Sequence, residues 1–241
     1  MAGHSHWAGI KHKKGRADKE RSKIFSKLSK EITVAAKLGD KDPDINPRLR
    51  TAIQAAKQAN MPKDNITRAI SKSELSGDKI YESLRYEGFG PLNIALIIET
   101  LTDNRNRSAS SIRTVLQKKG GRLGESGSTT HMFSNCGIIH VDKEKIKEEE
   151  IFELAINAGA KDCIIIKDIY EIITEKEDFY KIKTEIEKKV ETFNYSSIEW
   201  RALNYIDLDD IESKQIIEVL TALEELDDVQ NIFTNAKIKN F

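Results

Sequence analysis

Apolar residues recur with helical spacing in the first third of the chain. Between residues 18 and 38, they lie on one face of a single helix. These residues are Ile24, Leu28, Ile32 and Ala35. Gly39 follows directly, and because glycine commonly stands just after a helix, we expect the helix to end there.

Two more short helices are expected before residue 71. Asn46 can cap a helix with its side chain and Pro47 suits the first turn, so this pair predicts a helix that ends near residue 60. Pro62 predicts the start of a third helix, and the polar segment 71–78 indicates a linker. Residues 1–77 therefore predict a basic N-terminal arm followed by a three-helix domain.

Beyond residue 78 the pattern changes to short β-branched runs separated by turn residues. Strands are expected at 81–86, 92–100 and near 129–133, with a helix over about 107–118. Near the end of the chain, a helix is expected at 209–226 and a strand at 229–233. Neither group can bury a core alone, so residues 78–135 and 206–241 predict one discontinuous α+β domain.

The segment 136–205 has a complete pattern of its own. Strands are expected at 137–141, 163–167, 170–174 and 197–203, and helices at 145–158 and 177–192. This β-α-β-β-α-β order is ferredoxin-like, and it predicts a third domain inserted into the second. The chain as a whole is then an α+β protein.

The chain has no net charge, with 39 Lys and Arg against 39 Asp and Glu, but its charges are sorted along the sequence. Residues 1–77 hold 17 basic and 8 acidic side chains, whereas the remainder holds 22 and 31. A strongly basic end on a neutral protein favours binding of a polyanion, most often a nucleic acid.

The basic arm lacks an apolar period, so its lysines could follow phosphates while Trp7 stacks on a base. The candidate nucleic-acid-binding residues of this half are His4, His6, Trp7, Lys11, Lys13, Lys14, Arg16, Lys19, Arg21, Lys23, Lys27, Arg48 and Arg50. A solvated tail without a target is the alternative. If Met1 is removed, the free amine of Ala2, two backbone nitrogens and the His4 imidazole also have the spacing of a copper or nickel site, and whether such a site has any relevance stays open.

A second candidate site consists of Asn104, Arg105, Asn106 and Arg107, at the expected start of the helix over 107–118. Arginines and exposed N–H groups at a helix start can bind a phosphate. The alternative is a polar helix cap with surface salt bridges, and the sequence favours neither. Lys181 and Lys183, on the helix at 177–192, are expected to have no role in binding or stability.

No motif for catalysis or cofactor binding stands out. Gly124-Glu-Ser-Gly lacks the last glycine of a nucleophile elbow, and no Gly-Lys-Ser/Thr follows Gly120-Gly121. Asp209-Asp210 and Asp227-Asp228 could bind magnesium, which leaves a metal-dependent hydrolase as a remote alternative. We expect no enzyme activity, no cofactor and no bound metal.

Two features predict a cytoplasmic protein. No apolar run approaches the length of a membrane-spanning helix, so we expect no membrane partner. Cys136 and Cys163 fit no metal or redox spacing, which favours a reducing compartment.

Ten segments of the chain resemble the YebC/PmpR family. The first six are Met1-Ala-Gly-His-Ser-His-Trp, Ile10-Lys-His-Lys-Lys, Lys23-Ile-Phe-Ser-Lys, Glu31-Ile-Thr-Val-Ala-Ala-Lys, Asn46-Pro-Arg-Leu-Arg and Asn60-Met-Pro-Lys-Asp-Asn-Ile. The other four are Tyr86-Glu-Gly-Phe-Gly-Pro, Thr102-Asp-Asn-Arg-Asn-Arg, Gly124-Glu-Ser-Gly-Ser and Leu226-Asp-Asp-Val-Gln-Asn. The resemblance implies an N-terminal helical domain followed by two ferredoxin-like α/β sandwich domains.

The resemblance also implies a function. The family consists of probable cytoplasmic transcriptional regulators that bind DNA, and it includes the mitochondrial translational activator of cytochrome c oxidase subunit I. Some bacterial members are associated with the ribosome. We therefore expect a non-enzymatic, nucleic-acid-binding regulator of gene expression with DNA as its target. The alternative is a ribosome-associated translation factor that binds rRNA or tRNA, and the oligomeric state stays open.

Overall fold

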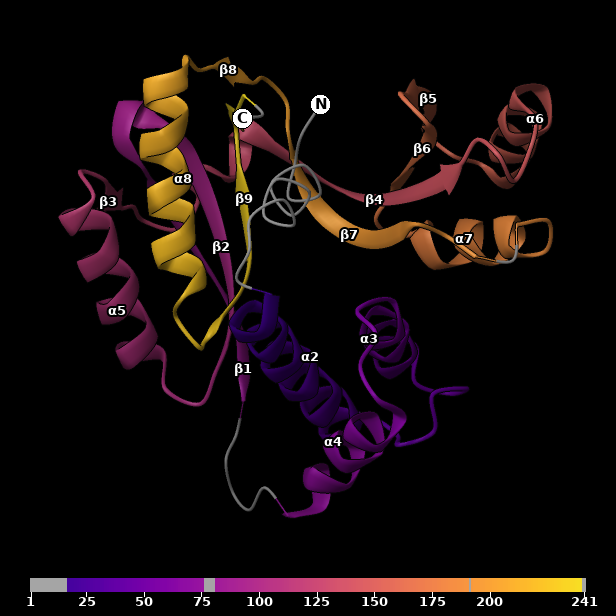
Figure 1. Cartoon of the computed structure of the whole chain (residues 1–241), viewed down its shortest axis with the longest axis horizontal. Helices are drawn as coiled ribbons and strands as arrows, with labels where there is room; N and C mark the ends of the chain where they lie inside the picture. The colour runs from indigo at the N-terminus through magenta and orange to yellow at the C-terminus, as the bar shows by residue number, and fades with distance from the viewer. Residues whose placement is uncertain (1–16, 76–80, 191, 240–241) are drawn as a thin grey trace.

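A helical unit, two four-stranded sheets with their own helices and a short two-stranded sheet make up the part of the chain described by the computed structural model, residues 17–75, 81–190 and 192–239 (Figure 1). The helical unit consists of α2 (Ala17–Leu38), α3 (Pro47–Gln58) and α4 (Lys63–Leu75). Its buried apolar side chains meet in one core, to which Ile32, Leu49 and Ile66 contribute from the three helices. The three expected helices are confirmed.

Asn46 caps α3 as its sequence position predicts. Its side-chain oxygen accepts a hydrogen bond from the Leu49 N–H at 3.0 Å, and its amide nitrogen donates to the carbonyl oxygen of Ala35 at 2.9 Å. Because Ala35 belongs to α2, the capping residue also ties the start of α3 to the end of α2. The buried side-chain amide of Asn46 thus has hydrogen-bond partners for both its oxygen and its nitrogen.

Residues 71–75 form the last turn of α4, so the linker expected at 71–78 was wrong for this part. The segment has no glycine or proline before Gly77. The Ser73 hydroxyl donates to the carbonyl oxygen of Ile70 at 2.7 Å, a bond that serine forms readily within a helix. Residues 76–80 lie outside the described residues.

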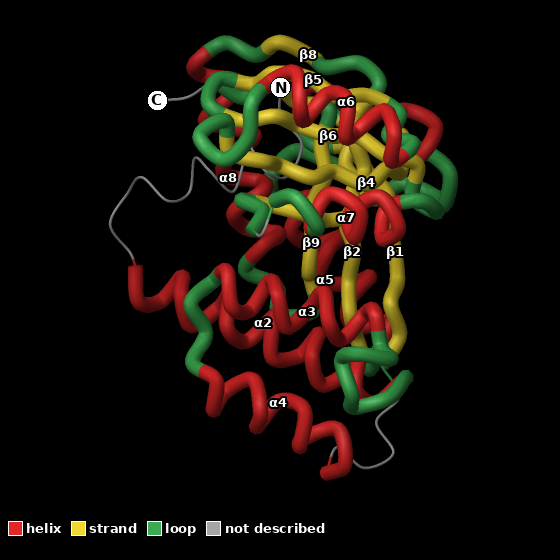
Figure 2. Tube along the Cα trace, turned by 90° about the vertical axis from the view of Figure 1, so that its right-hand side faces the viewer, coloured by secondary structure: helices red, strands yellow, loops and turns green. Residues whose placement is uncertain are grey.

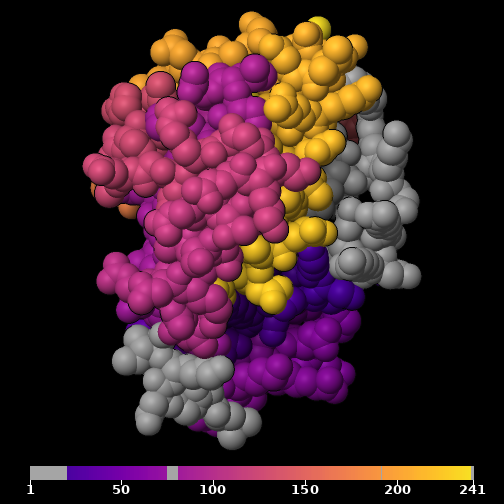
Figure 3. All heavy atoms as spheres, turned by 90° about the vertical axis from the view of Figure 1, so that its left-hand side faces the viewer, coloured from indigo at the N-terminus to yellow at the C-terminus, as the bar shows by residue number. Residues whose placement is uncertain are grey.

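The first sheet contains β1 (Glu82–Phe89), β2 (Ala95–Thr102), β3 (Arg122–Leu123) and β9 (Val229–Thr234), in the antiparallel order β3-β1-β2-β9. Helices α5 (Arg105–Lys118) and α8 (Asp210–Glu224) pack on one face, where Ile112 and Leu220 join strand residues such as Ile98. Figure 3 shows the outer side of these two helices. Distant segments of the chain therefore share one core.

The order of strands in this sheet is a permuted ferredoxin-like order. The unit β2-α5-β3 leaves a gap between its two parallel strands, and β1 fills that gap. β1 therefore occupies the position of the third strand of a ferredoxin-like domain, although it comes first in this chain.

The strand expected near 129–133 was wrong, because Thr130–Met132 is a 3-10 helix, η2. A second 3-10 helix, η1, occupies Pro91–Asn93. β2 therefore begins at Ala95 rather than at the expected residue 92.

The second sheet contains β4 (Phe133–Asp142), β5 (Asp162–Ile166), β6 (Ile169–Glu175) and β7 (Tyr195–Ala202). Its order, β5-β6-β4-β7, is that of a ferredoxin-like sheet, which confirms the expectation. Helices α6 (Glu148–Ala158) and α7 (Phe179–Glu187) pack on one face around Ile139 and Ile172. Gly159 ends α6 at a φ of 90°, a conformation that glycine adopts at little cost.

The two sheets meet through a small apolar cluster of Ala95, Ile97, Phe133, Ala202 and Phe233. β7 contacts β9 there, and Trp200 donates to the Glu99 carboxylate at 3.1 Å. A short parallel pair is formed by β8 (Ile206–Asp207), which follows β7 in the chain, and β10 (Ala236–Lys237), which follows β9. β4 begins at Phe133, so we propose that the inserted domain begins at that residue, three positions before the expected boundary.

The helical unit lies beneath the two sheets (Figure 2). Lys183 of α7 is buried where it faces α3, and its ammonium donates to the Gln54 side chain at 2.5 Å. The expectation that Lys183 has no structural role was therefore wrong, whereas Lys181 is exposed. No described helix has the length and apolar composition needed to cross a membrane.

Candidate nucleic-acid interface

Most candidate residues of the basic arm lie outside the described residues. These are His4, His6, Trp7, Lys11, Lys13, Lys14 and Arg16. Lys19 lies in the first turn of α2, Arg21 is exposed on the same helix, and Lys27 is partly buried. Lys23 forms an ion pair with Glu225 of the α8–β9 turn at 3.6 Å.

The two arginines of α3 form hydrogen bonds within the helical unit. Arg48 donates to both carboxylate oxygens of Glu31 on α2, at 2.7 and 3.1 Å, and this hydrogen-bonded partner raises the pKa of the guanidinium. Arg50 donates to the carbonyl oxygens of Pro43 and Asp44 in the loop before α3. Both residues therefore have structural partners that a phosphate would have to replace.

The segment 104–107 forms the start of α5, and its members differ in their partners. Asn104 is the cap, and its side-chain oxygen accepts from the Arg107 N–H at 3.0 Å. Arg107 pairs with Asp103 and Asp228, each at 2.8 Å. Arg105 is exposed, and no carboxylate of the described residues pairs with it; Asn106 is exposed as well.

Asp228 joins the helical unit to the first sheet. Its carboxylate accepts from Lys30 at 2.9 Å, from Arg107 at 2.8 Å and from the Ser108 hydroxyl at 2.8 Å. Burial alone would raise the pKa of this group, but the three donors outweigh it and hold the pKa at about 2. Asp228 is therefore charged at neutral pH, and it orients Lys30 at the edge of a cavity.

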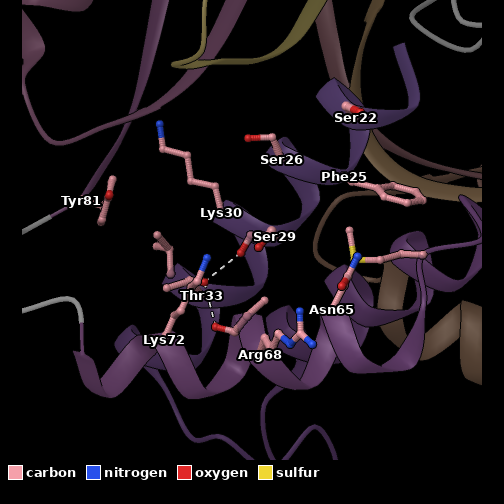
Figure 4. A pocket seen from close by; sticks show the side chains of 13 residues that line it. Ser22, Phe25, Ser26, Ser29, Lys30, Thr33, Asn65, Arg68, Lys72 and Tyr81 are labelled. Carbon is pink, nitrogen blue, oxygen red and sulfur yellow. Dashed lines mark hydrogen bonds between the residues drawn. The ribbon is translucent and has the colours of Figure 1, made fainter. Parts of the chain in front are cut away.

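That cavity is a cleft of about 650 Å³ between α2 and α4 (Figure 4). Its lining combines three cations, five serine, threonine and asparagine side chains, and an aromatic and apolar remainder. The lining residues are Ser22, Phe25, Ser26, Ser29, Lys30, Thr33, Val34, Met61, Asn65, Arg68, Ala69, Lys72 and Tyr81. We call this cavity the α2–α4 cleft.

Helical spacing brings the polar residues of the cleft to one face of each helix. On α2, Ser22, Ser26, Ser29 and Thr33 follow one another at intervals of four, three and four residues. On α4, Asn65, Arg68 and Lys72 are spaced by three and four. The Thr33 hydroxyl lies 2.8 Å from the Ala69 carbonyl oxygen, a hydrogen bond that joins the two walls.

The cations of the cleft can attract an anion. Arg68 and Lys72 are exposed, and neither has a carboxylate partner among the described residues. Lys30 uses one of its three ammonium protons on Asp228, which leaves two donors. The sequence-based candidates included none of Asn65, Arg68 and Lys72, although their common spacing on one helix face was a visible signal.

The remaining polar candidates have structural partners. His140 is buried and lies 2.9 Å from the Glu171 carboxylate, whereas His131 is exposed. Asp209 caps α8 together with Glu212. Burial raises the pKa of both thiols, Cys136 and Cys163, to about 11. Among residues 17–75, 81–190 and 192–239, no cluster of three or more potential metal ligands occurs.

Comparisons with known proteins cover nearly the whole chain. Residues 5–75 match the TACO1/YebC protein N-terminal domain, and residues 81–236 match the TACO1/YebC second and third domain. Proteins named probable transcriptional regulatory protein are 55% identical in Pelagibacter ubique, over the full length of both chains, and 46% identical in Aquifex aeolicus, over 99% of this chain and 96% of the other.

A solved structure supports the fold as well. The crystal structure of a conserved hypothetical protein, Aq1575 from Aquifex aeolicus, superposes with a TM-score of 0.82 at 43% sequence identity, and the match covers 98% of each chain. The helical unit, the two antiparallel sheets and the sequence matches agree over the full length. The chain therefore belongs to the TACO1/YebC family.

Proposed function

We propose that the protein is a non-enzymatic regulator of gene expression that binds nucleic acid, with DNA as its target in the cytoplasm. The observation that carries this proposal is the α2–α4 cleft, which places Lys30, Arg68 and Lys72 on one face of the basic helical unit. Cations that are grouped on one face can neutralise several phosphates at once, and this supplies most of the affinity of non-specific DNA binding.

The names of the relatives support a regulatory role. Two full-length relatives, in Pelagibacter ubique and Desulfosudis oleivorans, are named probable transcriptional regulatory protein, with 55% and 46% identity. The distribution of charge along this chain agrees with such a role, because 17 of its 39 basic side chains lie in residues 1–77. A basic arm beside a basic cleft would extend the contact along the backbone of the DNA.

Removal of residues 2–17 tests the proposal. We expect the shortened chain to lose most of its affinity for a DNA duplex, in a titration followed by fluorescence anisotropy. We expect its thermal unfolding to stay unchanged, because the arm has no apolar face to contribute to the core. Unchanged affinity would show that the arm does not bind, and early unfolding would show that it is packed against the fold.

A second candidate function is that of a translation factor on the ribosome. The concave shape of the α2–α4 cleft favours it, since proteins that recognise RNA mostly bind unpaired bases rather than regular duplexes. Sedimentation with ribosomes separates the two functions. A chain that sediments with ribosomes, and that RNA but not duplex DNA competes away, is a translation factor rather than a DNA-binding regulator.

A further inference from the structure

We propose that the α2–α4 cleft holds one unpaired nucleotide of the bound nucleic acid. The phosphate would lie at the end formed by Lys30 and Lys72, and the base at the end formed by Phe25 and Asn65. This inference rests on the proposed function, and it adds a defined ligand: a nucleotide whose base is free to leave its stack.

The two ends of the cleft differ in chemistry. Figure 4 places Lys30, Lys72 and Tyr81 toward one end and Phe25 and Asn65 toward the other, with Arg68 along the α4 wall. The ammonium of Lys30 lies 5.5 Å from the centre of the Tyr81 ring and 2.9 Å from the Asp228 carboxylate. These contacts hold Lys30 in place before a phosphate arrives, so little side-chain entropy is lost on binding.

The cleft as a whole keeps a surplus of positive charge. Asp228 neutralises one of the charges at Lys30 and Arg107, but Arg68 and Lys72 have no carboxylate partner in the described part of the chain. The hydroxyls of Ser26 and Ser29 on the facing wall are further donors. Two cations and nearby hydroxyls match the needs of one phosphate group, which accepts several hydrogen bonds.

The other end of the cleft suits a base. Phe25 packs against the core of the helical unit and lines the cleft, so the fold fixes the position of its ring. Base stacking on such a ring is favourable for every base. Asn65 can hydrogen-bond the edge of the base, and Met61, which is 6% exposed, closes the apolar floor.

The size and shape of the cleft exclude the base pairs of a regular duplex from its interior. Its volume of about 650 Å³ is typical of a site for one small molecule, and the base pairs of a duplex lie inside the stack, out of reach of such a site. A bulged or single-stranded nucleotide can enter, because unstacking it costs little. The cleft therefore predicts a preference for unpaired positions.

A duplex with one bulged nucleotide tests this inference. The full chain is titrated with a short duplex and with the same duplex carrying a single 2-aminopurine bulge, each in a DNA and an RNA version. We expect the bulge to raise the affinity by about tenfold, the contribution of one stacked base, and the 2-aminopurine fluorescence to change on binding. The DNA and RNA versions show which backbone supplies the nucleotide.

The double variant Arg68→Ala and Lys72→Ala should remove this preference and the fluorescence change. Lys63→Ala is the matched control, because Lys63 is exposed on the same helix and does not line the cleft. We expect it to keep the preference. Equal affinity of the wild-type chain for duplex and bulge, or an unaltered preference in the double variant, would overturn the inference while the proposed function stands. No binding to any of the four probes would overturn the proposed function itself.

Discussion

At the scale of single residues, Glu87 shows how one buried carboxylate fixes a loop. It accepts hydrogen bonds from the backbone N–H groups of Gly127, Thr129 and Thr130, at 2.8 to 2.9 Å, and from the Thr130 hydroxyl at 2.6 Å. Burial opposes the charge, but these donors prevail and lower the pKa of Glu87 to about 2. Glu87 therefore holds the loop that contains Gly127 and Thr129 in place.

Glu87→Gln should destabilise the fold at neutral pH by about 1–3 kcal/mol, because an amide cannot accept all of these hydrogen bonds. The lowered pKa of Glu87 stabilises the folded state above the unfolded pKa near 4.5, and this contribution is lost as the pH falls toward 2. The free energies of unfolding of the wild-type chain and of Glu87→Gln, measured with urea, should therefore differ less at pH 3 than at pH 7. An equal difference at both pH values would contradict the conclusion that the ionised Glu87 carboxylate stabilises the fold.

Gly137 in β4 allows α7 to approach the second sheet. A Cβ at this position would overlap the Phe179 ring and the Thr174 hydroxyl, so Gly137→Ala should cost about 1–3 kcal/mol through overpacking. At Gly90, a Cβ would meet its nearest neighbour, Leu96, at 3.7 Å, and Gly90→Ala should change the free energy of unfolding little. Thermal unfolding of the two variants compares them directly, and similar melting temperatures would refute this role of Gly137.

At the scale of elements, the two arginines at the start of α5 differ in their ion-pair partners, although the sequence pattern does not distinguish them. Arg107 is neutralised by Asp103 and Asp228, whereas Arg105 is exposed without a carboxylate partner in the described residues. A phosphate at this helix start would therefore bind Arg105 and the free N–H groups. Arg107 contributes mainly to the junction around Asp228.

Arg105→Ala should weaken binding to nucleic acid by about 1–3 kcal/mol, the value of a charged hydrogen bond. Arg107→Ala should leave affinity nearly unchanged and lower stability by less than about 1 kcal/mol, as for exposed ion pairs. Lys181→Ala on α7 is the control for a general loss of charge. Binding titrations and thermal unfolding of all three variants provide the comparison. Normal binding by Arg105→Ala would show that the segment 104–107 only caps the helix and does not bind a phosphate.

The sequence predicted those elements whose signals are local. The Asn46–Pro47 helix start needs only neighbouring residues, and so does the apolar period of α2. The strand expected near 129–133 was wrong because the backbone of Thr129 and Thr130 bonds to Glu87, more than forty residues away. β3 is two residues long, too short for any periodic pattern.

At the scale of the whole molecule, the charge of the first 77 residues could be counted from the sequence, but the α2–α4 cleft could not. The cleft depends on how α4 packs against α2, and on Tyr81 and Asp228, which come from later parts of the chain. Packing of distant segments has no local signature. The sequence-based candidates therefore favoured the arm and did not include Arg68 and Lys72, whose common spacing on α4 was visible in the sequence but whose position beside α2 was not.

The salt dependence of binding tests the central claim, that a basic N-terminal unit binds the phosphate backbone, most directly. If about six cations of this unit contact phosphates, the logarithm of the affinity of the full chain for a DNA duplex should fall with the logarithm of salt concentration at a slope of roughly −5. Removal of residues 2–17 should make the slope shallower. A slope near zero for the full chain would contradict the account, because recognition would then not depend on phosphate contacts.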